Sequence, residues 1–230
     1  MGRQIKRYER DAKIWKEEPE NIIVLVGTNI YLDKSEVVYD QKDFTEEILK
    51  RDFDIKTGEW YVEDGWVVGK NPESNPGMIV SKEDYLGDVM MEVTAKMVEP
   101  STHDINLMLH GEWHDDTNKR GNAYVTGLEA FWHGHIGFEK SPEYKLVVAA
   151  GKKDFDPEKE YRIRFGNVGP IIFTYIDGDL GLLVRDPNPL DINKYGKIGF
   201  EAFASWWKFK DLKVYNLESE YVGEKYHSEF

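Results

Sequence analysis

The densest group of side chains that could do chemistry lies between His110 and Lys140. This segment holds four of the six histidines, two of the tryptophans and several acidic residues. Imidazole and carboxylate groups are the usual acid–base pair near neutral pH, and a binding cleft combines aromatic side chains with a few polar groups. The segment therefore predicts a cleft whose candidate catalytic residues are His110, Glu112, Glu129 and His133.

Two expected strands, joined by a loop at residues 114–121, would hold these groups. The side chains of a strand alternate between its two faces, so His110 and Glu112 are expected together on an outer face. Consecutive strands of an antiparallel sandwich are usually neighbours, which would bring the second strand alongside the first. Gly127 permits a bulge that would change the face of Glu129.

The expected outer faces carry aromatic rings as well as charges, a mixture that suits a sugar ligand. Aromatic rings stack on the apolar faces of pyranose rings, and charged or amide groups hydrogen-bond the hydroxyls. The alternative interpretation is that the outer charges are solvated and that Trp206 packs under a loop. Under the ligand interpretation, the side chains expected to contact substrate are Trp113, Tyr124, Trp132, His135, Arg164 and Trp206.

The sequence His133-Gly134-His135 offers two metal ligands on one strand face. A third ligand would have to come from His110, Glu112 or Glu129, so the pattern alone identifies neither a metal nor a cofactor. The sequence Asp177-Gly178-Asp179 could suggest calcium, but Asp-Gly is better explained as a tight hairpin turn.

The elements that must position these residues are short strands. From residue 21 onward, runs rich in Val, Ile, Tyr, Phe and Trp alternate with Gly, Asp, Asn or Pro clusters, the pattern of an all-β sandwich. We predict a concanavalin A-like jelly roll of two antiparallel sheets, with turns at Asp64-Gly65, Gly166-Asn167 and Asp177-Gly178. The expected core residues are Leu107, Leu109, Ile163, Phe165, Ile198, Phe200 and Phe209.

The expected organisation is one domain with short extensions. Residues 1–20 predict an amphipathic helix, residues 21–217 the sandwich and residues 218–230 a polar tail. The first twenty residues lack the apolar run of a secretory signal, so we expect a cytoplasmic protein. The exposed aromatic residues and the N-terminal helix are compatible with a homodimer.

Composition excludes several classes of function. The chain has a net charge of -13, which disfavours nucleic acid and anionic membranes as partners because both are negative. It has no cysteine, so disulfides, thiolate catalysis and cysteine-based zinc sites are excluded.

The order of motifs resembles two related groups of proteins, the YesU-like family of concanavalin A-like proteins and the 3-keto-disaccharide hydrolase-like family. The resemblance covers about residues 40–217 and implies the same fold and a role in carbohydrate breakdown, on pectin-type fragments or oxidised glycosides. The stretches that carry it are EWYVEDGWVVGK, GNAYVTGLEAFWHGHIGFEKSPEY, YRIRFGN, FTYIDGDLGLLVRDPNPLDINKYGKIGFEAF and WKFKDLKVYNL.

Two functions from different classes follow. The first is a lyase or hydrolase of small plant-polysaccharide fragments, and the second is a non-catalytic, lectin-like module that binds an oligosaccharide or modified sugar. Retaining glucanases of this fold place two glutamates on one strand as E-x-D-x-x-E, which does not occur here, so a carboxylate pair would come from separate strands, such as Glu112 and Glu129. A closed pocket with a carboxylate and a histidine would favour the enzyme, and an open aromatic platform the lectin.

Overall fold

The computed structural model describes residues 21–25, 27–129, 135–143, 146–150 and 154–223. The helix expected over residues 1–20 lies outside these residues. The chain divides into two compact units, residues 37–216 and a smaller unit made of residues 1–36 and 217–230. In the smaller unit, β1 (Ile22–Leu25), β2 (Thr28–Tyr31) and β18 (Ser219–Tyr221) form an antiparallel sheet. The sandwich thus begins at residue 37 rather than 21, and part of the expected tail is a strand.

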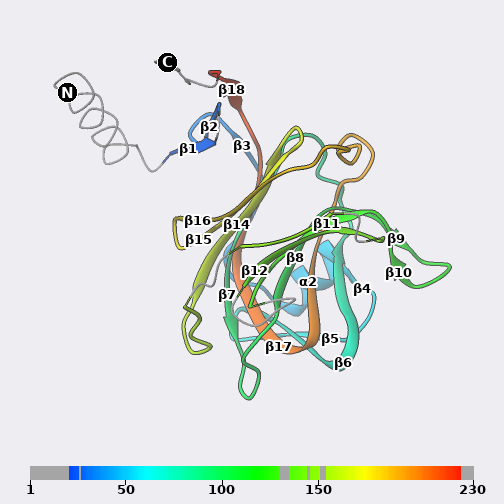
Figure 1. Cartoon of the computed structure of the whole chain (residues 1–230). Coiled ribbons are helices and arrows are strands. Elements are labelled where there is room, and N and C mark those ends of the chain that lie inside the picture. The colour runs from blue at the N-terminus through cyan, green and yellow to red at the C-terminus, as the bar shows by residue number, and fades with distance from the viewer. Residues whose placement is uncertain (1–20, 26, 130–134, 144–145, 151–153, 224–230) are drawn as a thin grey trace. The chain divides into compact units, whose positions relative to one another are not determined.

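The larger unit is a jelly-roll sandwich of two antiparallel layers (Figure 1). The first sheet runs in the order β4, β6, β17, β8, β11, β12, β13, and the second in the order β5, β6, β17, β7, β14, β15, β16. The first six strands of this unit are β3 (Glu36–Gln41), β4 (Phe53–Ile55), β5 (Glu59–Glu63), β6 (Trp66–Ser81), β7 (Val89–Met97) and β8 (Ile105–Gly111). The others are β9 (Trp113–His114), β10 (Lys119–Arg120), β11 (Ala123–Leu128), β12 (Ile136–Ser141), β13 (Leu146–Ala149), β14 (Tyr161–Val168), β15 (Ile171–Ile176), β16 (Asp179–Arg185) and β17 (Lys197–Asn216).

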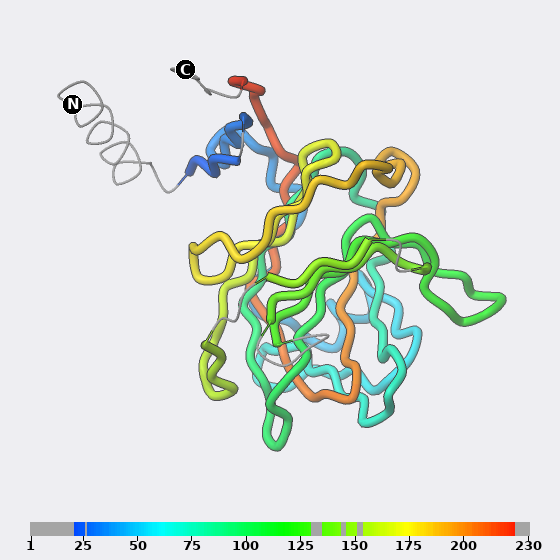
Figure 2. Tube along the Cα trace, in the orientation of Figure 1, coloured from blue at the N-terminus to red at the C-terminus, as the bar shows by residue number. Residues whose placement is uncertain are grey.

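Strands β6 and β17 belong to both layers because each bends. Residues 199–203 of β17 pair with the second half of β6 and with β8, whereas residues 205–209 pair with the first half of β6 and with β7. The register shifts at the bend, where Ala204 has a φ of 48°. Figure 2 shows this bend of β17 in orange. A bulge of this kind lets one strand cross from sheet to sheet.

The core lies between the layers and confirms the residues predicted from alternation. Leu107, Leu109, Ile163, Phe165, Ile198, Phe200 and Phe209 are all at most 1% exposed. Phe200 of the first sheet and Phe209 of the second stack with their ring centroids 3.8 Å apart.

Replacing Phe200 by alanine is expected to lower the free energy of unfolding by about 3–5 kcal/mol, because it removes a buried ring and leaves a cavity. Leu180→Ala is the control, since Leu180 is 49% exposed and its loss should cost less than about 1 kcal/mol. Urea unfolding of both variants measures the difference. Equal, small effects would mean that Phe200 is not a core residue.

Two of the three predicted turns are confirmed. Asp64-Gly65 and Asp177-Gly178 each have two successive positive φ angles, of 50° and 81° and of 54° and 86°, as tight hairpins require. The predicted turn at Gly166-Asn167 is wrong, because β14 continues to Val168. Asn167 is buried, and its side-chain oxygen accepts a hydrogen bond from the backbone N–H of Val89. Its polar side chain therefore satisfies a buried backbone donor and does not mark a turn.

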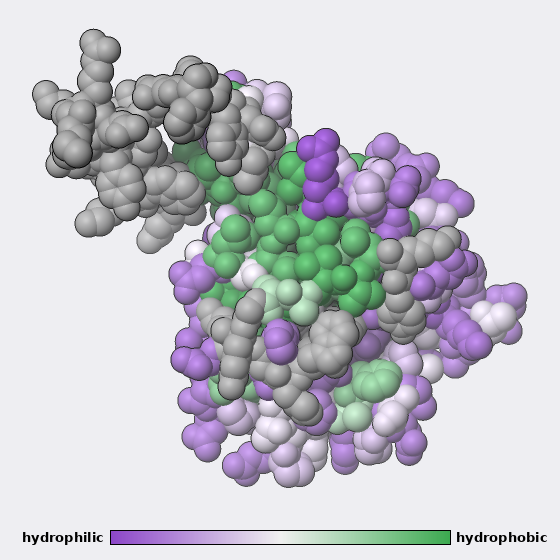
Figure 3. Space-filling view, viewed as in Figure 1, coloured by the Kyte–Doolittle hydropathy of each residue, from purple (hydrophilic) through white to green (hydrophobic). Residues whose placement is uncertain are grey.

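One short helix, α2 (Glu46–Asp52), is present among the described residues of the sandwich unit. Thr45 caps it by accepting a hydrogen bond from Ile48 N at 3.2 Å. No helix in the described part of the chain is long and apolar enough to span a membrane. Apolar side chains gather on one face of the molecule (Figure 3). Val147 of β13 and Leu180 of β16, the strands at the two ends of the sheet order, are exposed.

Candidate functional site

The outer face of the first sheet carries buried polar groups. Glu201 of β17 is opposite Asn106 of β8, Asn106 is opposite Gly127 of β11, and Gly127 is opposite Gly137 of β12. The two glycines place no side chain on this row. Glu139 follows on the same face of β12, two residues beyond Gly137. Glu139, Glu201 and Asn106 are nevertheless buried, which is unusual for polar residues on an outer face.

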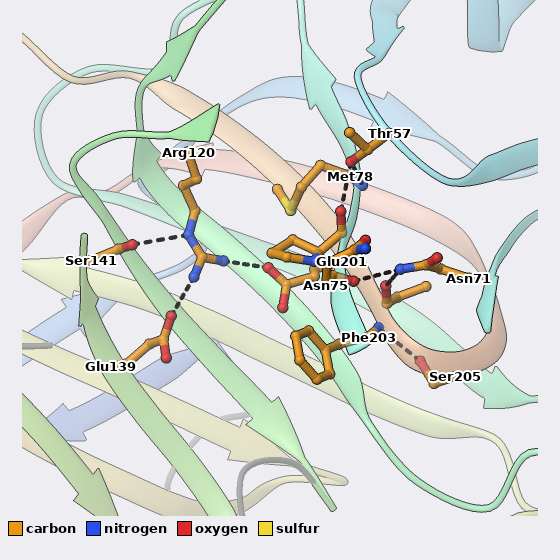
Figure 4. A network of polar contacts seen from close by, with 12 residues as sticks. Thr57, Asn71, Asn75, Met78, Arg120, Glu139, Ser141, Glu201, Phe203 and Ser205 are labelled. Atoms are coloured by element: carbon orange, nitrogen blue, oxygen red, sulfur yellow. Dashed lines mark hydrogen bonds and ion pairs between the residues drawn. The ribbon is translucent and has the colours of Figure 1, made fainter. Parts of the chain in front are cut away.

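Arg120 connects two of these carboxylates. It lies in β10, at the base of the β9–β10 hairpin, which we define as residues 112–121. Its terminal nitrogens donate one hydrogen bond to Glu201 and one to Glu139, and its Nε donates to Ser141 Oγ at 3.0 Å (Figure 4). Its side chain is only 8% exposed. The guanidinium thus bridges residues from strands that are three places apart in the sheet.

A third carboxyl group, that of Asp104, precedes β8 and is affected by the charges of these glutamates. Burial raises the pKa of Asp104 to about 7, and the charges of Glu201 and Glu139 add to this. Burial also raises the pKa of Glu139 to about 7, against the lowering effect of Arg120. Burial raises the pKa of Glu201 in the same way, again opposed by Arg120. Arg120 therefore pairs with two carboxyl groups while a third lies near them, and near neutral pH protonated and ionised carboxyls coexist. We call Asp104, Arg120, Glu139 and Glu201 the acidic cluster.

Replacing Asp104 by asparagine is expected to stabilise the fold more at pH 8 than at pH 5. The folded-state pKa lies above that of an unfolded aspartate, so the folded protein binds more protons, and stability falls as pH rises toward about 7. Asparagine does not titrate, so the variant does not lose stability in this way. The free energy by which the variant exceeds the wild type in stability should therefore be larger at pH 8 than at pH 5, by about 1–3 kcal/mol. Urea unfolding at both pH values measures it. An identical effect at pH 5 and pH 8 would contradict the raised pKa.

An amide oxygen without a partner lies beside the cluster. Within the described residues, Asn106 Oδ1 accepts no hydrogen bond, although Asn106 is only 3% exposed. Trp113 Nε1 is likewise without a partner there. Trp113 packs on the apolar part of this face, and the half-buried ring of Phe203 lies next to Glu201 (Figure 4). Buried groups without partners are costly, and a ligand is one way to satisfy them.

A hollow of about 660 Å³ borders this site. Its wall includes Ser141, which accepts the hydrogen bond of Arg120 Nε, and His114 and Gly121 of the β9–β10 hairpin. Tyr195 and Lys140 also line it. A volume of this size accommodates a small ligand such as one or two sugar rings.

The prediction that His110 lies on the outer face is wrong. The pairing of β8 with β17 shifts register between Lys197 and Gly199, and His110 has a φ of 49°. This bulge turns the imidazole into the sandwich, where Nε2 lies 2.7 Å from Asn167 Oδ1 and Nδ1 lies 2.9 Å from Tyr195 O. His110 is fully buried, and burial lowers its pKa. It is therefore separated from Glu112 and from the outer face.

Two of the other predicted catalytic residues lie at the edges of the site, and the third lies outside the residues that the structure describes. Glu112, in the β9–β10 hairpin, accepts a hydrogen bond from Asn122 Nδ2 at 3.1 Å and lies 3.5 Å from His114 Nε2. Glu129 is half-buried just after β11, with a φ of 53°, and the pairing of β11 is continuous through Gly127, so there is no bulge at that glycine. His133, like Trp132, lies outside the described residues.

Three predicted substrate contacts lie away from the acidic cluster. Tyr124 is in the core, where its hydroxyl donates to Asp186 at 2.9 Å, so its side chain is not available to a ligand on the outer face. Arg164 lies on the second sheet, paired with Glu92. Trp206 follows the bend of β17 and so also belongs to the second sheet. Trp113 lies beside the cluster, and His135 directly precedes β12.

No group of three or more histidine, aspartate or glutamate side chains suited to a metal occurs among the described residues. Of the proposed His133/His135 pair, only His135 is described. The acidic cluster, with a guanidinium between its carboxylates, is arranged to share protons and hydrogen bonds.

The acidic cluster was not among the predicted site residues. A signal for it exists, since alternation around Phe200 already places Glu201 on the outer side of β17, and a glutamate flanked there by glycine and apolar residues is unusual. Arg120 carries no such signal, because it comes from a hairpin whose path across the sheet cannot be inferred from periodicity.

Solved structures share this fold at low sequence identity. A carbohydrate-binding module from Bacillus subtilis aligns with a TM-score of 0.56 at 16% identity over 71% of this chain and 95% of that one. A protein with a galectin-like fold from Bacillus subtilis gives a TM-score of 0.64 at 15% identity, covering 80% and 98%. An endo-β-1,3-glucanase from Pyrococcus furiosus gives 0.59 at 12%, covering 88% and 100%. No protein-family model and no curated protein matches the sequence. The similarity establishes the fold.

Proposed function

We propose that this protein binds a glycan on the outer face of its first sheet and cleaves a glycosidic bond with the carboxyl groups of Glu139 and Glu201. The observation that carries the proposal is the bridge made by Arg120 between these two buried carboxyls. Glycosidases need one protonated carboxyl and one ionised carboxylate at the scissile bond. Here burial favours the protonated form and Arg120 favours the ionised form, so a pair can hold one proton near neutral pH.

The chemistry requires the pair to act in two roles. The protonated carboxyl gives its proton to the glycosidic oxygen as the bond to the anomeric carbon breaks. The ionised carboxylate either attacks that carbon or takes a proton from the water that does so. Burial raises the pKa of both carboxyls and so favours the proton-donating form, and the charge of Glu201 raises the pKa of Glu139 further.

Access to the pair involves the β9–β10 hairpin. Arg120 and Trp113 are opposite one another in this hairpin, and both lie against the outer face. The hollow beside Ser141 is the entry, because the hairpin forms part of its wall. A sugar in the hollow reaches Glu139 and Glu201 when the base of the hairpin moves and Arg120 releases at least one of them.

The structural neighbours support a carbohydrate ligand through their names, which include a carbohydrate-binding module, an endo-β-1,3-glucanase and a putative glycosyl hydrolase from Parabacteroides distasonis. The pectin-type fragments and oxidised glycosides that the sequence suggests are candidate substrates within this class.

The second candidate function is glycan binding without cleavage. The half-buried rings of Trp113 and Tyr195, at the site and in the wall of the hollow, favour it, because a lectin needs aromatic surface and hydrogen bonds but no shared proton. In that case Arg120 and the two glutamates would only orient sugar hydroxyls.

The two functions are separated by incubating the protein with neutral oligosaccharides, oligouronides and 3-keto glycosides and analysing the products by mass spectrometry. Hydrolysis or elimination products that increase with time support the enzyme. Binding in calorimetry without products supports the lectin. Neither binding nor products across the panel would contradict both proposals.

A further inference from the structure

We infer that the sugar ring entering the acidic cluster carries hydroxyl or amide N–H donors and no carboxylate, so that neutral glycans are accepted and uronates are excluded. This inference rests on the proposed function and specifies the substrate class of the same site. It narrows the candidates that the sequence suggests, because pectin backbones contain uronates.

The charge of the acidic cluster disfavours a carboxylate on the sugar. Within the described residues, Arg120 supplies the guanidinium that pairs with Glu139 and Glu201, and Asp104 lies close enough for the charges of both glutamates to act on it. Lys140 is next to Glu139 in sequence, but its Nζ pairs with Asp186 at 2.7 Å, on the opposite face of β12. A sugar carboxylate would therefore enter a buried site with an excess of negative charge and no free cation to pair with it, which is strongly unfavourable.

The hydrogen-bonding groups of the site favour a ligand that supplies donors. Asn106 Oδ1 is a buried acceptor for which the described residues supply no donor. Asn106 is opposite Glu201 in the register of β17 and β8, so its side chain projects from the same outer face. Ionised carboxylates also only accept hydrogen bonds. A ligand that satisfies Asn106 Oδ1 must supply a donor, as the hydroxyls of a neutral sugar or the N–H of an N-acetyl group do, and a hydroxyl can also accept a hydrogen bond from Trp113 Nε1.

The first test compares oligouronides with the same oligosaccharides after chemical reduction of each carboxyl to a hydroxymethyl group. Linkage and length are then identical, and only the charge and its donors differ. Calorimetry is expected to give at least tenfold tighter binding of the reduced form in each pair that binds. Equal or tighter binding of the uronate would overturn this inference while leaving the proposed glycan site intact. Absence of binding by every probe, including a panel of neutral oligosaccharides, would instead overturn the proposed function.

The second test replaces Asn106 by leucine, which has a similar shape and no acceptor. Binding of the best neutral oligosaccharide should weaken at least tenfold. The urea midpoint of unfolding is measured alongside and should fall, because leucine also removes the hydrogen bond of the Asn106 side chain to Asp104. Asn193→Leu, at an exposed position, is the matched control and should change neither. Unchanged affinity in Asn106→Leu would contradict the role of this acceptor.

A third variant keeps the inference testable if Asn106→Leu fails to fold. Asp104→Asn removes one negative charge from the cluster, so the preference for the reduced over the uronate form should narrow at least threefold at pH 8, where Asp104 is ionised. The same preference in the variant and the wild type would contradict the electrostatic argument.

Discussion

Replacement of Glu201 by glutamine is expected to lower the rate of glycoside cleavage by about 10²–10⁴-fold, the range typical for loss of an acid or base. Glutamine can accept the hydrogen bond of Arg120 but can neither ionise nor hold the transferable proton. Affinity for the oligosaccharide should remain measurable, because the amide still hydrogen-bonds hydroxyls. Product release followed over time, together with calorimetry, separates the two quantities. Glu139→Gln should have the same effect.

Glu160→Gln is the matched control, because Glu160 is exposed and lies outside the cluster. Its rate and affinity should equal those of the wild type. Stability should not explain the loss in Glu201→Gln, since burial raises the pKa of Glu201 and a neutral side chain costs less to bury. A fully active Glu201→Gln variant would exclude Glu201 from catalysis.

Replacement of Arg120 by methionine is expected to destabilise the fold by about 3–5 kcal/mol at pH 8, because it leaves buried carboxylates without their cation. The pKa values of Glu139 and Glu201 would rise further in the folded state. The variant then loses stability as the pH rises through the folded-state pKa values of the two glutamates. The destabilisation caused by Arg120→Met should therefore be smaller at pH 5, where the carboxyls take up protons. Urea unfolding at pH 5 and pH 8 measures both quantities.

Arg162→Met is the control for this variant. Arg162 also pairs with a buried glutamate, Glu92, but its side chain is 60% exposed and Arg164 remains as a second partner. Its replacement should cost no more than about 1 kcal/mol. If Arg120→Met were as mild as Arg162→Met at both pH values, the bridge of Arg120 would not hold ionised carboxylates.

Alternation predicted the fold and the core because strand period and burial are local properties of the chain. Leu107, Phe165 and Phe209 follow from the spacing of apolar residues alone. The turn at Asp64-Gly65 follows from the need for positive φ angles. The small sheet of β1, β2 and β18 could not be predicted in this way, because it joins segments from the two ends of the sequence.

The candidate site was predicted only in part, for two physical reasons. A bulge reverses the face of His110, and no residue near it signals the bulge, since the residue with positive φ is the histidine itself. The cluster also depends on tertiary placement. Glu201 could be assigned to an outer face, but its proximity to Glu139 depends on Arg120 reaching across from a hairpin. Trp113, which comes from the predicted region, packs on the apolar part of the same outer face.

The most direct test of the account is a crystal structure of the Glu201→Gln variant with the neutral oligosaccharide that binds it most tightly. We expect a sugar ring on the outer face of the first sheet, with one hydroxyl donating to Asn106 Oδ1 and the glycosidic oxygen beside Glu139. We also expect that Arg120 no longer bridges Glu139 and the glutamine. An oligosaccharide bound elsewhere, with the bridge intact, would contradict the central claim.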